Sequence, residues 1–343
     1  MKQRIEELAA IAAPSGREQP VRAYLLDALA KSPAELSCST DRLGNLLVDV
    51  KGKARPKKRV LFAAHMDEVG LMIRDITEDG YLRFVTVGGI DTRVLLGRQV
   101  LVNGHVGVIG CKAVHLATKE ERRRVPEADT LLIDIGAHSR EQAEEVVKVG
   151  DVAVFDSDFT ALGGDLFKAK ALDDRAGCAL LLALLQEVPP YDFTVAFTVQ
   201  EEIGLRGAQT AAFAVQPDIA VVVDATTAAD TVGVPTDRQV CHVGGGAVVS
   251  FMDRRTLYDH ELYTAILRLA AQHGLRAQPK TMVAGGNDAG AIQTTGAGAR
   301  VAAVSLPCRY IHSPSCVLSE RDCADTLSLL RLLAETLPAG ELV

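Results

Sequence analysis

The amino-acid sequence predicts an α/β protein in which a mixed, mostly parallel sheet is sandwiched by helices and an all-β, barrel-like domain is inserted. Two features of the 343-residue chain support this class. Before residue 70 and after residue 163, short apolar runs alternate with segments of helical periodicity, which is typical of a largely parallel sheet covered on both faces. Between residues 71 and 162, valine- and glycine-rich alternation replaces the helical periods. We therefore expect one domain built from residues 1–70 and 163–343, with residues 71–162 inserted as a second domain.

The predicted elements before the inserted domain are two helices followed by strands. Residues 2–12 and 18–31 show the apolar spacing of amphipathic helices. The runs N-L-L-V-D-V and R-V-L-F-A-A-H, which end at residues 50 and 65, are short and apolar and are predicted to be strands. Within the inserted domain, the turn signal E-D-G at 78–80 separates two further strand candidates.

After residue 163, strands and helices alternate again. Strands are expected over residues 193–199, 219–223 and 300–305. Helices are expected over residues 172–188, 257–273 and 319–337, the last with Ser319 as its N-cap. This order is typical of a sheet whose parallel strands are connected by helices.

Composition and charge argue against several classes of protein. The hydrophobic content of 48% supports a sizeable core. The net charge of −7 and the lack of a long basic run argue against a nucleic-acid partner, because phosphate binding needs clustered Lys and Arg. The longest aliphatic run, at residues 177–185, is far shorter than the roughly 20 residues that span a bilayer.

The cysteines and the N-terminal segment indicate a cellular location. The seven cysteines are scattered and show no C-x-x-C spacing, which fits reduced thiols. The N-terminal segment has acidic residues within its apolar part and does not look like a signal sequence. We therefore expect a soluble, cytoplasmic protein without a membrane partner.

Polar side chains follow the predicted strands at the point where each strand ends. They are His65 and Asp67, Glu201 and Glu202, Asp224, and His312, while Asp173 and Asp174 stand at the start of a predicted helix. In open α/β sheets, ligands bind outside the carboxyl ends of the strands. We therefore expect these residues to share one edge of the sheet.

Each of these residues alone has a simpler explanation. Asp173 or Asp174 alone is suited to capping a helix, His65 to a hydrogen-bonded core position, and Asp224 to an Asx turn. Together, however, they would crowd several carboxylates at one edge with few cations nearby, and neighbouring buried carboxylates repel each other. The crowding indicates a positively charged partner.

Two divalent metal ions would be such a partner. Zinc and cobalt accept imidazole and carboxylate ligands, and a bridging carboxylate can hold two ions about 3.5–4 Å apart. One of the adjacent glutamates, Glu201 or Glu202, can then bind metal while the other acts as a general base. A purely structural zinc site is disfavoured, because such sites are rich in cysteine and Cys308 and Cys316, which flank His312, lack zinc-ligand spacing.

A series of short motifs carries a resemblance to a known family. In order, they are A-P-S-G-R-E, D-R-L-G-N, A-A-H-M-D-E-V-G, K-A-L-D-D-R-A-G, Q-E-E-I-G-L-R-G-A, V-V-D-A-T, G-G-N-D-A-G and R-Y-I-H-S-P. Their order and spacing make the whole chain similar to the dinuclear metallo-aminopeptidases of the tetrahedral (TET) type, metallopeptidase family forty-two. This family includes glutamyl and deblocking aminopeptidases and some proteins labelled endoglucanase. The chain departs from the pattern where V-G-G-G-A at 243–247 lacks a proline, and where Asn287 replaces the commoner threonine.

The resemblance implies a zinc-exopeptidase-like fold and a metal-dependent aminopeptidase that acts on peptides. Carried over by motif, it makes His65 and Asp224 ligands of one ion, Glu202 and His312 ligands of the other, Asp173 the bridge, Glu201 the general base acting on a bridging hydroxide, and Asp67 the group that fixes the ring of His65. It implies two divalent ions per chain, Zn²⁺ or Co²⁺. It also implies that residues 71–162 form a dimerisation domain, and that dimers assemble into a tetrahedral dodecamer.

Two other functions stay open from the sequence. A glycoside hydrolase would place two carboxylic groups around a sugar, usually with aromatic platforms, whereas this chain has no Trp and only 4% aromatic residues. A non-catalytic metal-dependent scaffold would have no use for Glu201. The preferred N-terminal residue is also open, although Arg254, Arg255 or Arg309 could supply a cation for an acidic substrate side chain.

Overall fold

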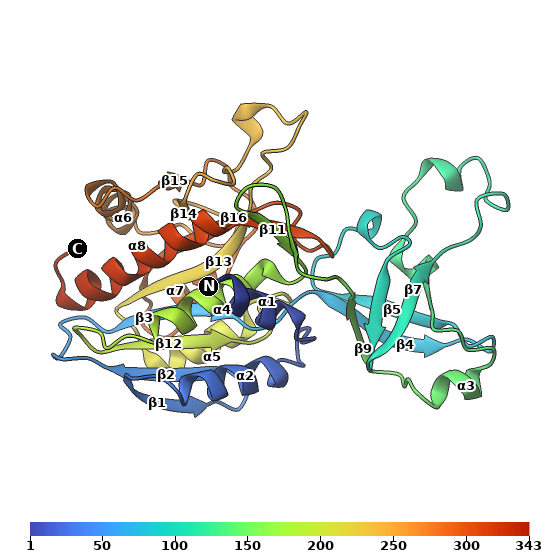
Figure 1. The fold of residues 1–343 in the computed structure, drawn as a ribbon, viewed down its shortest axis with the longest axis horizontal. Coiled ribbons are helices and arrows are strands. Elements are labelled where there is room, and N and C mark those ends of the chain that lie inside the picture. Colours follow the sequence, from blue (N-terminus) through green and yellow to red (C-terminus); the bar gives the residue numbers. More distant parts are fainter. Residues whose placement is uncertain (343) are drawn as a thin grey trace.

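In the computed structural model, which describes residues 1–342, one eight-stranded sheet forms the centre of the α/β domain (Figure 1). Its strand order is β1 (Glu35–Thr40), β2 (Leu46–Lys51), β12 (Phe193–Thr198), β3 (Val60–His65), β13 (Ile219–Thr227), β16 (Arg300–Cys308), β14 (Ala247–Val249) and β15 (Ala277–Pro279). The four central strands, from β12 to β16, are parallel. The predicted mixed, mostly parallel sheet is thereby confirmed.

Helices cover both faces of this sheet, which explains why its central strands are continuously apolar. In β3, Val60, Phe62 and Ala64 face the larger core, whereas Leu61 and Ala63 face the smaller one. The larger core lies under α1 (Lys2–Ala10), α2 (Gln19–Leu29), α4 (Leu172–Leu184), α6 (His260–Gln272) and α8 (Glu320–Ala339). The smaller core lies under α5 (Arg206–Val215) and α7 (Ala289–Thr294).

Several element boundaries differ from the predicted ones. The helix predicted over residues 257–273 begins at His260, because the Asp259 side chain accepts a hydrogen bond from the backbone of Leu262 and caps it. β13 continues four residues and β16 three residues beyond their predicted ends, since their parallel pairing extends to Thr227 and Cys308. The predicted N-cap Ser319 is confirmed, because its side chain accepts from the backbone N–H of Asp322.

The inserted segment forms a closed six-stranded antiparallel barrel beside the α/β domain (Figure 1). Its strands, in order around the barrel, are β4 (Gly70–Ile76), β5 (Leu82–Val87), β8 (Leu132–Asp134), β7 (His105–Gly110), β6 (Gln99–Val102) and β9 (Val152–Phe155). The helix α3 (Arg140–Glu144) lies against it, and the barrel has an apolar core of its own. The predicted barrel-like insertion in the fold is thereby confirmed.

A small sheet follows the barrel on the way back to the α/β domain. It consists of β10 (Thr160–Ala161), β11 (Leu166–Ala169) and β17 (Cys316–Ser319).

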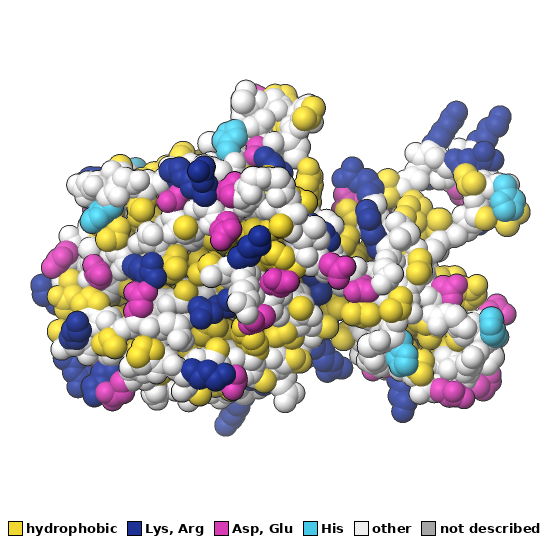
Figure 2. Space-filling view, viewed as in Figure 1, with side chains coloured by type: hydrophobic (Ala, Val, Ile, Leu, Met, Phe, Trp, Pro, Cys, Tyr) yellow, Lys and Arg dark blue, Asp and Glu magenta, His cyan; other side chains and the backbone are white. Residues whose placement is uncertain are grey.

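Figure 2 shows acidic and basic side chains interspersed over the visible face of the α/β domain, whereas Lys and Arg side chains gather at the end of the long β7–β8 loop. All seven cysteines are free. Among residues 1–342, none of the helices has the length and apolar character needed to span a membrane.

A buried ion cluster ties the N-terminal helix to the region where β3 meets the barrel. Both carboxylate oxygens of Glu68 lie 2.9 Å from the ammonium of Lys170, and one of them lies 3.3 Å from Arg175. The guanidinium of Arg175 also donates to the carbonyls of Leu8, Ile11 and Ala13. These three charged side chains are almost completely buried, so each depends on the others for compensation.

Replacing Glu68 by Gln should therefore strongly destabilise the fold. The change keeps the shape of the side chain but leaves Lys170 and Arg175 without their shared negative charge, which costs about 3–5 kcal/mol when one partner of a buried ion pair is removed. Urea unfolding measures the loss. The matched control is Glu35→Gln, which breaks only the exposed pair with Lys51 and should cost less than about 1 kcal/mol. Equal effects of the two variants would contradict the importance of the buried cluster.

Candidate metal centre

The carboxyl ends of the central strands bring the predicted site residues to one edge of the sheet. β3 ends at His65, which is paired with Thr198 at the end of β12, so Glu201 and Glu202 follow close by. Asp224 lies in the extended part of β13, and Asp173 lies in the first turn of α4. His312 lies in the loop between β16 and β17.

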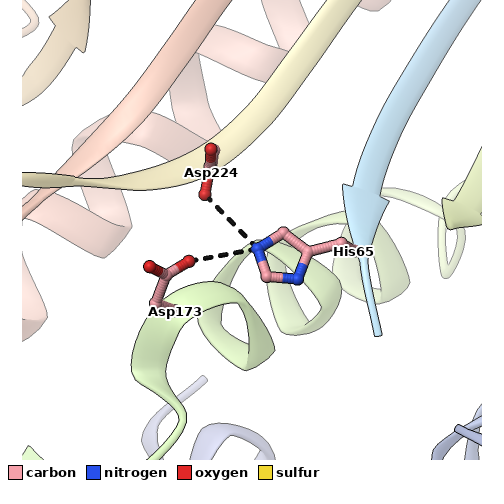
Figure 3. Close-up of side chains that lie close together, drawn as sticks. All are labelled: His65, Asp173 and Asp224. Carbon is pink, nitrogen blue, oxygen red and sulfur yellow. Dashed lines mark hydrogen bonds and ion pairs between the residues drawn. The ribbon is translucent and has the colours of Figure 1, made fainter. Parts of the chain in front are cut away.

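The first ligand group consists of His65, Asp173 and Asp224 (Figure 3). The Nε2 atom of His65 lies 3.1 Å from Asp173 Oδ1 and 3.7 Å from Asp224 Oδ1. Its Nδ1 atom lies 3.1 Å from the backbone carbonyl oxygen of Asp67. Since a carbonyl oxygen can only accept, Nδ1 carries the hydrogen, and Nε2 points toward the two carboxylates.

The second ligand group consists of Asp173, Glu202 and His312. The Nε2 atom of His312 lies 3.3 Å from Asp173 Oδ2 and 3.3 Å from Glu202 Oε2. Asp173 therefore belongs to both groups, with one carboxylate oxygen directed to each. This is the geometry that a bridging carboxylate requires.

Burial and mutual repulsion disfavour the charged forms of Glu202 and Asp224, two of these carboxylates. Burial raises the pKa of Glu202 to about 8 and that of Asp224 to about 6, and the nearby charge of Asp173 adds to both shifts. For His312, burial opposes protonation, but hydrogen bonding to Asp173 and the charge of Glu202 outweigh it and raise the pKa to about 10. The surroundings of the two groups therefore favour a positive charge.

The donor atoms fit two divalent ions. Each group offers one imidazole and two carboxylates, a ligand set that zinc and cobalt accept. The buried Oε1 atom of Glu202 has no hydrogen-bond partner within the described chain, so it is free to bind a cation. Cys308 and Cys316 are both buried, and their thiols donate to the backbone carbonyls of Arg309 and Ser313 rather than joining either group.

The two acids at the start of α4 have separate tasks. Asp173 belongs to the ligand groups, whereas the Asp174 carboxylate accepts hydrogen bonds from the backbone N–H groups of His65 and Gly177. A Cβ atom at position 177 would lie 2.3 Å from this carboxylate, so only glycine allows the approach. From the sequence, either Asp173 or Asp174 was suited to capping this helix. In the structure, Asp174 accepts the hydrogen bond at the helix start.

The Asp67 carboxylate links the two sides of the site. Its Oδ1 atom accepts from the backbone N–H of Glu201 at 3.1 Å, and its Oδ2 atom accepts from that of Glu202 at 3.2 Å. Oδ1 also lies 3.5 Å from His65 Nδ1, and Oδ2 accepts from the Ser15 hydroxyl at 2.6 Å. The sequence places Asp67 behind His65, and the structure adds that it holds the backbone of both glutamates.

Sequence reasoning missed the part played by the N-terminal segment. Besides the bond from Ser15 to Asp67, the Glu18 carboxylate accepts from the backbone N–H groups of Gly16 and Gln200. The motif A-P-S-G-R-E therefore packs beside Q-E-E and fixes its backbone. In the sequence, the only indication of this contact was that A-P-S-G-R-E and Q-E-E-I-G-L-R-G-A both belong to the motifs of the family resemblance.

A cavity of about 510 Å³ opens onto both ligand groups. Glu201 lies in its wall, and its carboxylate belongs to neither group. Burial raises the pKa of Glu201 well above its usual range. The position and basicity of this carboxylate suit a proton acceptor beside the ligand groups.

Positively charged side chains also line the cavity. Arg254 and Arg255 line it, as the sequence suggested, whereas Arg309 forms a two-pronged ion pair with Asp230. Sequence reasoning missed Lys280, which is only 6% exposed and whose ammonium donates to the carbonyl of Ala284. Among the described residues, no carboxylate lies within 4 Å of this ammonium.

Comparison with known proteins finds relatives that are similar to this chain over most of its length. A protein-family model, M42 glutamyl aminopeptidase, matches residues 44–329. A putative aminopeptidase of Acetivibrio thermocellus is 37% identical over 328 residues, which cover 95% of this chain and 96% of that protein. A lysyl aminopeptidase of Pyrococcus furiosus is 33% identical, with 87% and 86% of the two chains covered.

Solved structures show the same fold. An aminopeptidase from the archaeon Desulfurococcus kamchatkensis is 35% identical and superposes with a TM-score of 0.92, covering 97% of this chain and 94% of its own. The TET1 peptidase of Pyrococcus horikoshii, described as able to assemble into a tetrahedron or a large octahedral shell, is 34% identical with a TM-score of 0.85 and covers 97% and 98% of the two chains. With a family match over most of its length and such relatives, this chain belongs to the M42 family of aminopeptidases.

Proposed function

We propose that this chain is a metal-dependent aminopeptidase that uses two divalent ions and Glu201 as its general base. Membership of the family makes it a hydrolase of the aminopeptidase type. The observation that carries the finer proposal is the carboxylate of Asp173, whose two oxygens face two separate groups of an imidazole and a carboxylate. A cytoplasmic location is proposed as well, and the seven free thiols support it.

In this proposal, each side chain has a defined task. Bound at the two groups, zinc or cobalt ions would lower the pKa of water and stabilise negative charge on the substrate carbonyl. Glu201 takes the proton of the attacking water while the oxygen bonds to the scissile carbonyl carbon. Glu201 then passes this proton to the leaving amine as the C–N bond breaks. Asp67 keeps the backbone of Glu201 in place through its 3.1 Å hydrogen bond.

The different surroundings of the adjacent glutamates support this division of labour. Glu202 is directed to His312 at 3.3 Å, whereas Glu201 faces the cavity without a side-chain partner among the described residues. A glycosidase reading has less support, because the acids converge on imidazoles instead of flanking an open sugar site with aromatic platforms.

The substrate side chain is proposed to be acidic. Lys280 is a buried cation whose ammonium donates to the neutral backbone carbonyl of Ala284, and Arg254 and Arg255 line the same cavity. A buried charge is costly unless it is paired, so a carboxylate of the N-terminal substrate residue would complete the site. A basic substrate residue would instead be repelled by the same three side chains.

Replacing Glu201 by Gln should reduce turnover by at least about 100-fold, the typical contribution of a general base. The amide keeps the size of the side chain but cannot accept the proton. Because Glu201 belongs to neither ligand group, two metal equivalents per chain should still bind, as measured by elemental analysis after reconstitution with zinc. Loss of one equivalent from this variant would exchange the roles of Glu201 and Glu202.

Replacing Lys280 by Met should change the substrate preference selectively. Removing the buried ammonium should lower kcat/KM for a glutamyl anilide by roughly 10- to 100-fold, the value of a hydrogen bond to a charged group. kcat/KM for a leucyl anilide should change little. Lys31→Met, which breaks only an exposed ion pair with Asp27, is the matched control. A parallel loss of both activities in Lys280→Met would instead indicate a structural role.

The barrel is proposed to be a dimerisation domain, with dimers assembling into a tetrahedral dodecamer. Outward-facing aliphatic side chains support this, because Val106 and Val108 on β7 are 52% and 46% exposed and Val85 on β5 is also exposed. Monomers rarely leave such patches uncovered. The assembly described for the TET1 peptidase of Pyrococcus horikoshii supports the larger particle.

A charged pair of substitutions tests the barrel interface. The double variant Val106→Glu and Val108→Glu should sediment as a smaller species than the unchanged protein, because two buried carboxylates would oppose association. Val188→Glu, at a position of the α/β domain that is 49% exposed, should leave the sedimentation coefficient unchanged. An unaltered assembly in the double variant would place the dimer contact elsewhere.

A further inference from the structure

One loop of the barrel reaches the second ligand group. After β5, residues Gly88 and Gly89 pass beside the second ligand group, and Gly89 lines the cavity. The carbonyl oxygen of Gly89 lies 2.7 Å from His312 Nδ1, although the two residues are 223 positions apart in the chain. This is the shortest hydrogen-bond distance that either site imidazole makes in the structure.

This contact determines which nitrogen of His312 is available for metal. A carbonyl oxygen can only accept, so the hydrogen of the neutral ring resides on Nδ1. The lone pair of the ring is then on Nε2, which faces Asp173 and Glu202 at 3.3 Å. Hydrogen bonds of this kind orient metal-binding histidines and raise their basicity.

The same loop also packs against Glu202. Gly88 has a φ of +85°, and a Cβ atom at this position would lie 2.8 Å from Val69 Cγ1, 3.3 Å from Glu202 Cβ and 3.5 Å from Glu202 Oε2. Position 88 therefore has no room for a larger residue and favours glycine for its backbone as well. By contrast, Gly89 has no positive φ, and a Cβ atom there would meet His312 Nδ1 at 3.7 Å, an ordinary contact.

We propose that the Gly88–Gly89 loop of the barrel is a positioning element for the second ligand group, setting the tautomer of His312 and the place of the Glu202 side chain. The inference rests on the proposed function, in which His312 and Glu202 hold a metal ion. It assigns to the barrel a part in metal binding that is separate from any part in association of subunits.

The two ligand groups differ in this dependence on the barrel. The Nδ1 atom of His65 is held by the carbonyl of Asp67, two residues away in the same strand-end loop. The ring of His65 is thus oriented by the α/β domain alone. A disturbance of the Gly88–Gly89 loop should therefore weaken the binding of the metal ion at the second group and leave the binding at the first group unchanged.

Two neighbouring glycine substitutions test the proposal. Gly88→Ala forces the loop away from Val69 and Glu202 and displaces the Gly89 carbonyl, whereas Gly89→Ala keeps this carbonyl and is the matched control. Metal-stripped proteins are titrated with Co²⁺ against a competing chelator, and the dissociation constants of both equivalents and the visible absorption of bound Co²⁺ are recorded. The reference variant His312→Gln identifies the equivalent that belongs to the second group.

Gly88→Ala should raise the dissociation constant of that equivalent by about 10- to 100-fold, the usual effect of losing a group that orients a metal ligand. Its absorption spectrum should change, while the other equivalent and the Gly89→Ala protein should behave like the unchanged chain. Unaltered affinities in Gly88→Ala, or equal weakening of both equivalents, would overturn the proposal.

Circular dichroism of the stripped proteins separates misfolding from a local effect. Should Gly88→Ala fail to fold, the added change Val69→Ala removes the 2.8 Å contact, and the double variant must still show the selective loss. The number of metal equivalents that the unchanged chain binds tests the proposed dinuclear function itself. If it binds fewer than two equivalents, the proposed dinuclear function fails, whereas two equivalents of unchanged affinity in the Gly88→Ala protein reject only the role of the loop.

Discussion

The concentration of buried negative charge at the carboxyl edge of the sheet is the constraint on which the rest of the site depends. Asp173 lies beside Asp224 in one ligand group and beside Glu202 in the other, and Glu201 lies in the same cavity. Repulsion among such groups must be offset by cations or by protons. The fold therefore has to hold these side chains against a force that drives them apart, and its hydrogen bonds are arranged accordingly.

Backbone groups do much of this holding. Asp67 binds the N–H groups of Glu201 and Glu202, the two imidazoles are held by the carbonyls of Asp67 and Gly89, and Asp174 holds the N–H of His65. Main-chain donors and acceptors carry no net charge, so they orient the ligand side chains without cancelling the negative charge that a metal ion would meet. Ser15 and Glu18 extend this support to the N-terminal segment.

The sequence predicts the parts of this arrangement that follow from local pattern. Apolar strands that end in polar residues indicate the sheet and the edge at which His65, Glu202 and Asp224 meet, because parallel strands align their carboxyl ends. Lys280, Ser15 and the Gly88–Gly89 loop were not predicted as parts of the site, since their contacts join segments far apart in the chain and leave no periodic signal. The exposed edge strand β1 and the short helix α7 were not predicted either, because few of their residues contribute to an apolar pattern.

The Gly89–His312 hydrogen bond has a consequence for the folding of the protein during its synthesis. It joins residues separated by 223 positions, and the bond from Arg175 to Leu8 joins residues separated by 167. Contacts of such long range form only when both ends of the chain segment are available, and they are slow to close. On the ribosome, His65, Glu201 and Glu202 are synthesised long before His312. The second ligand group therefore stays incomplete until synthesis of the chain is almost finished.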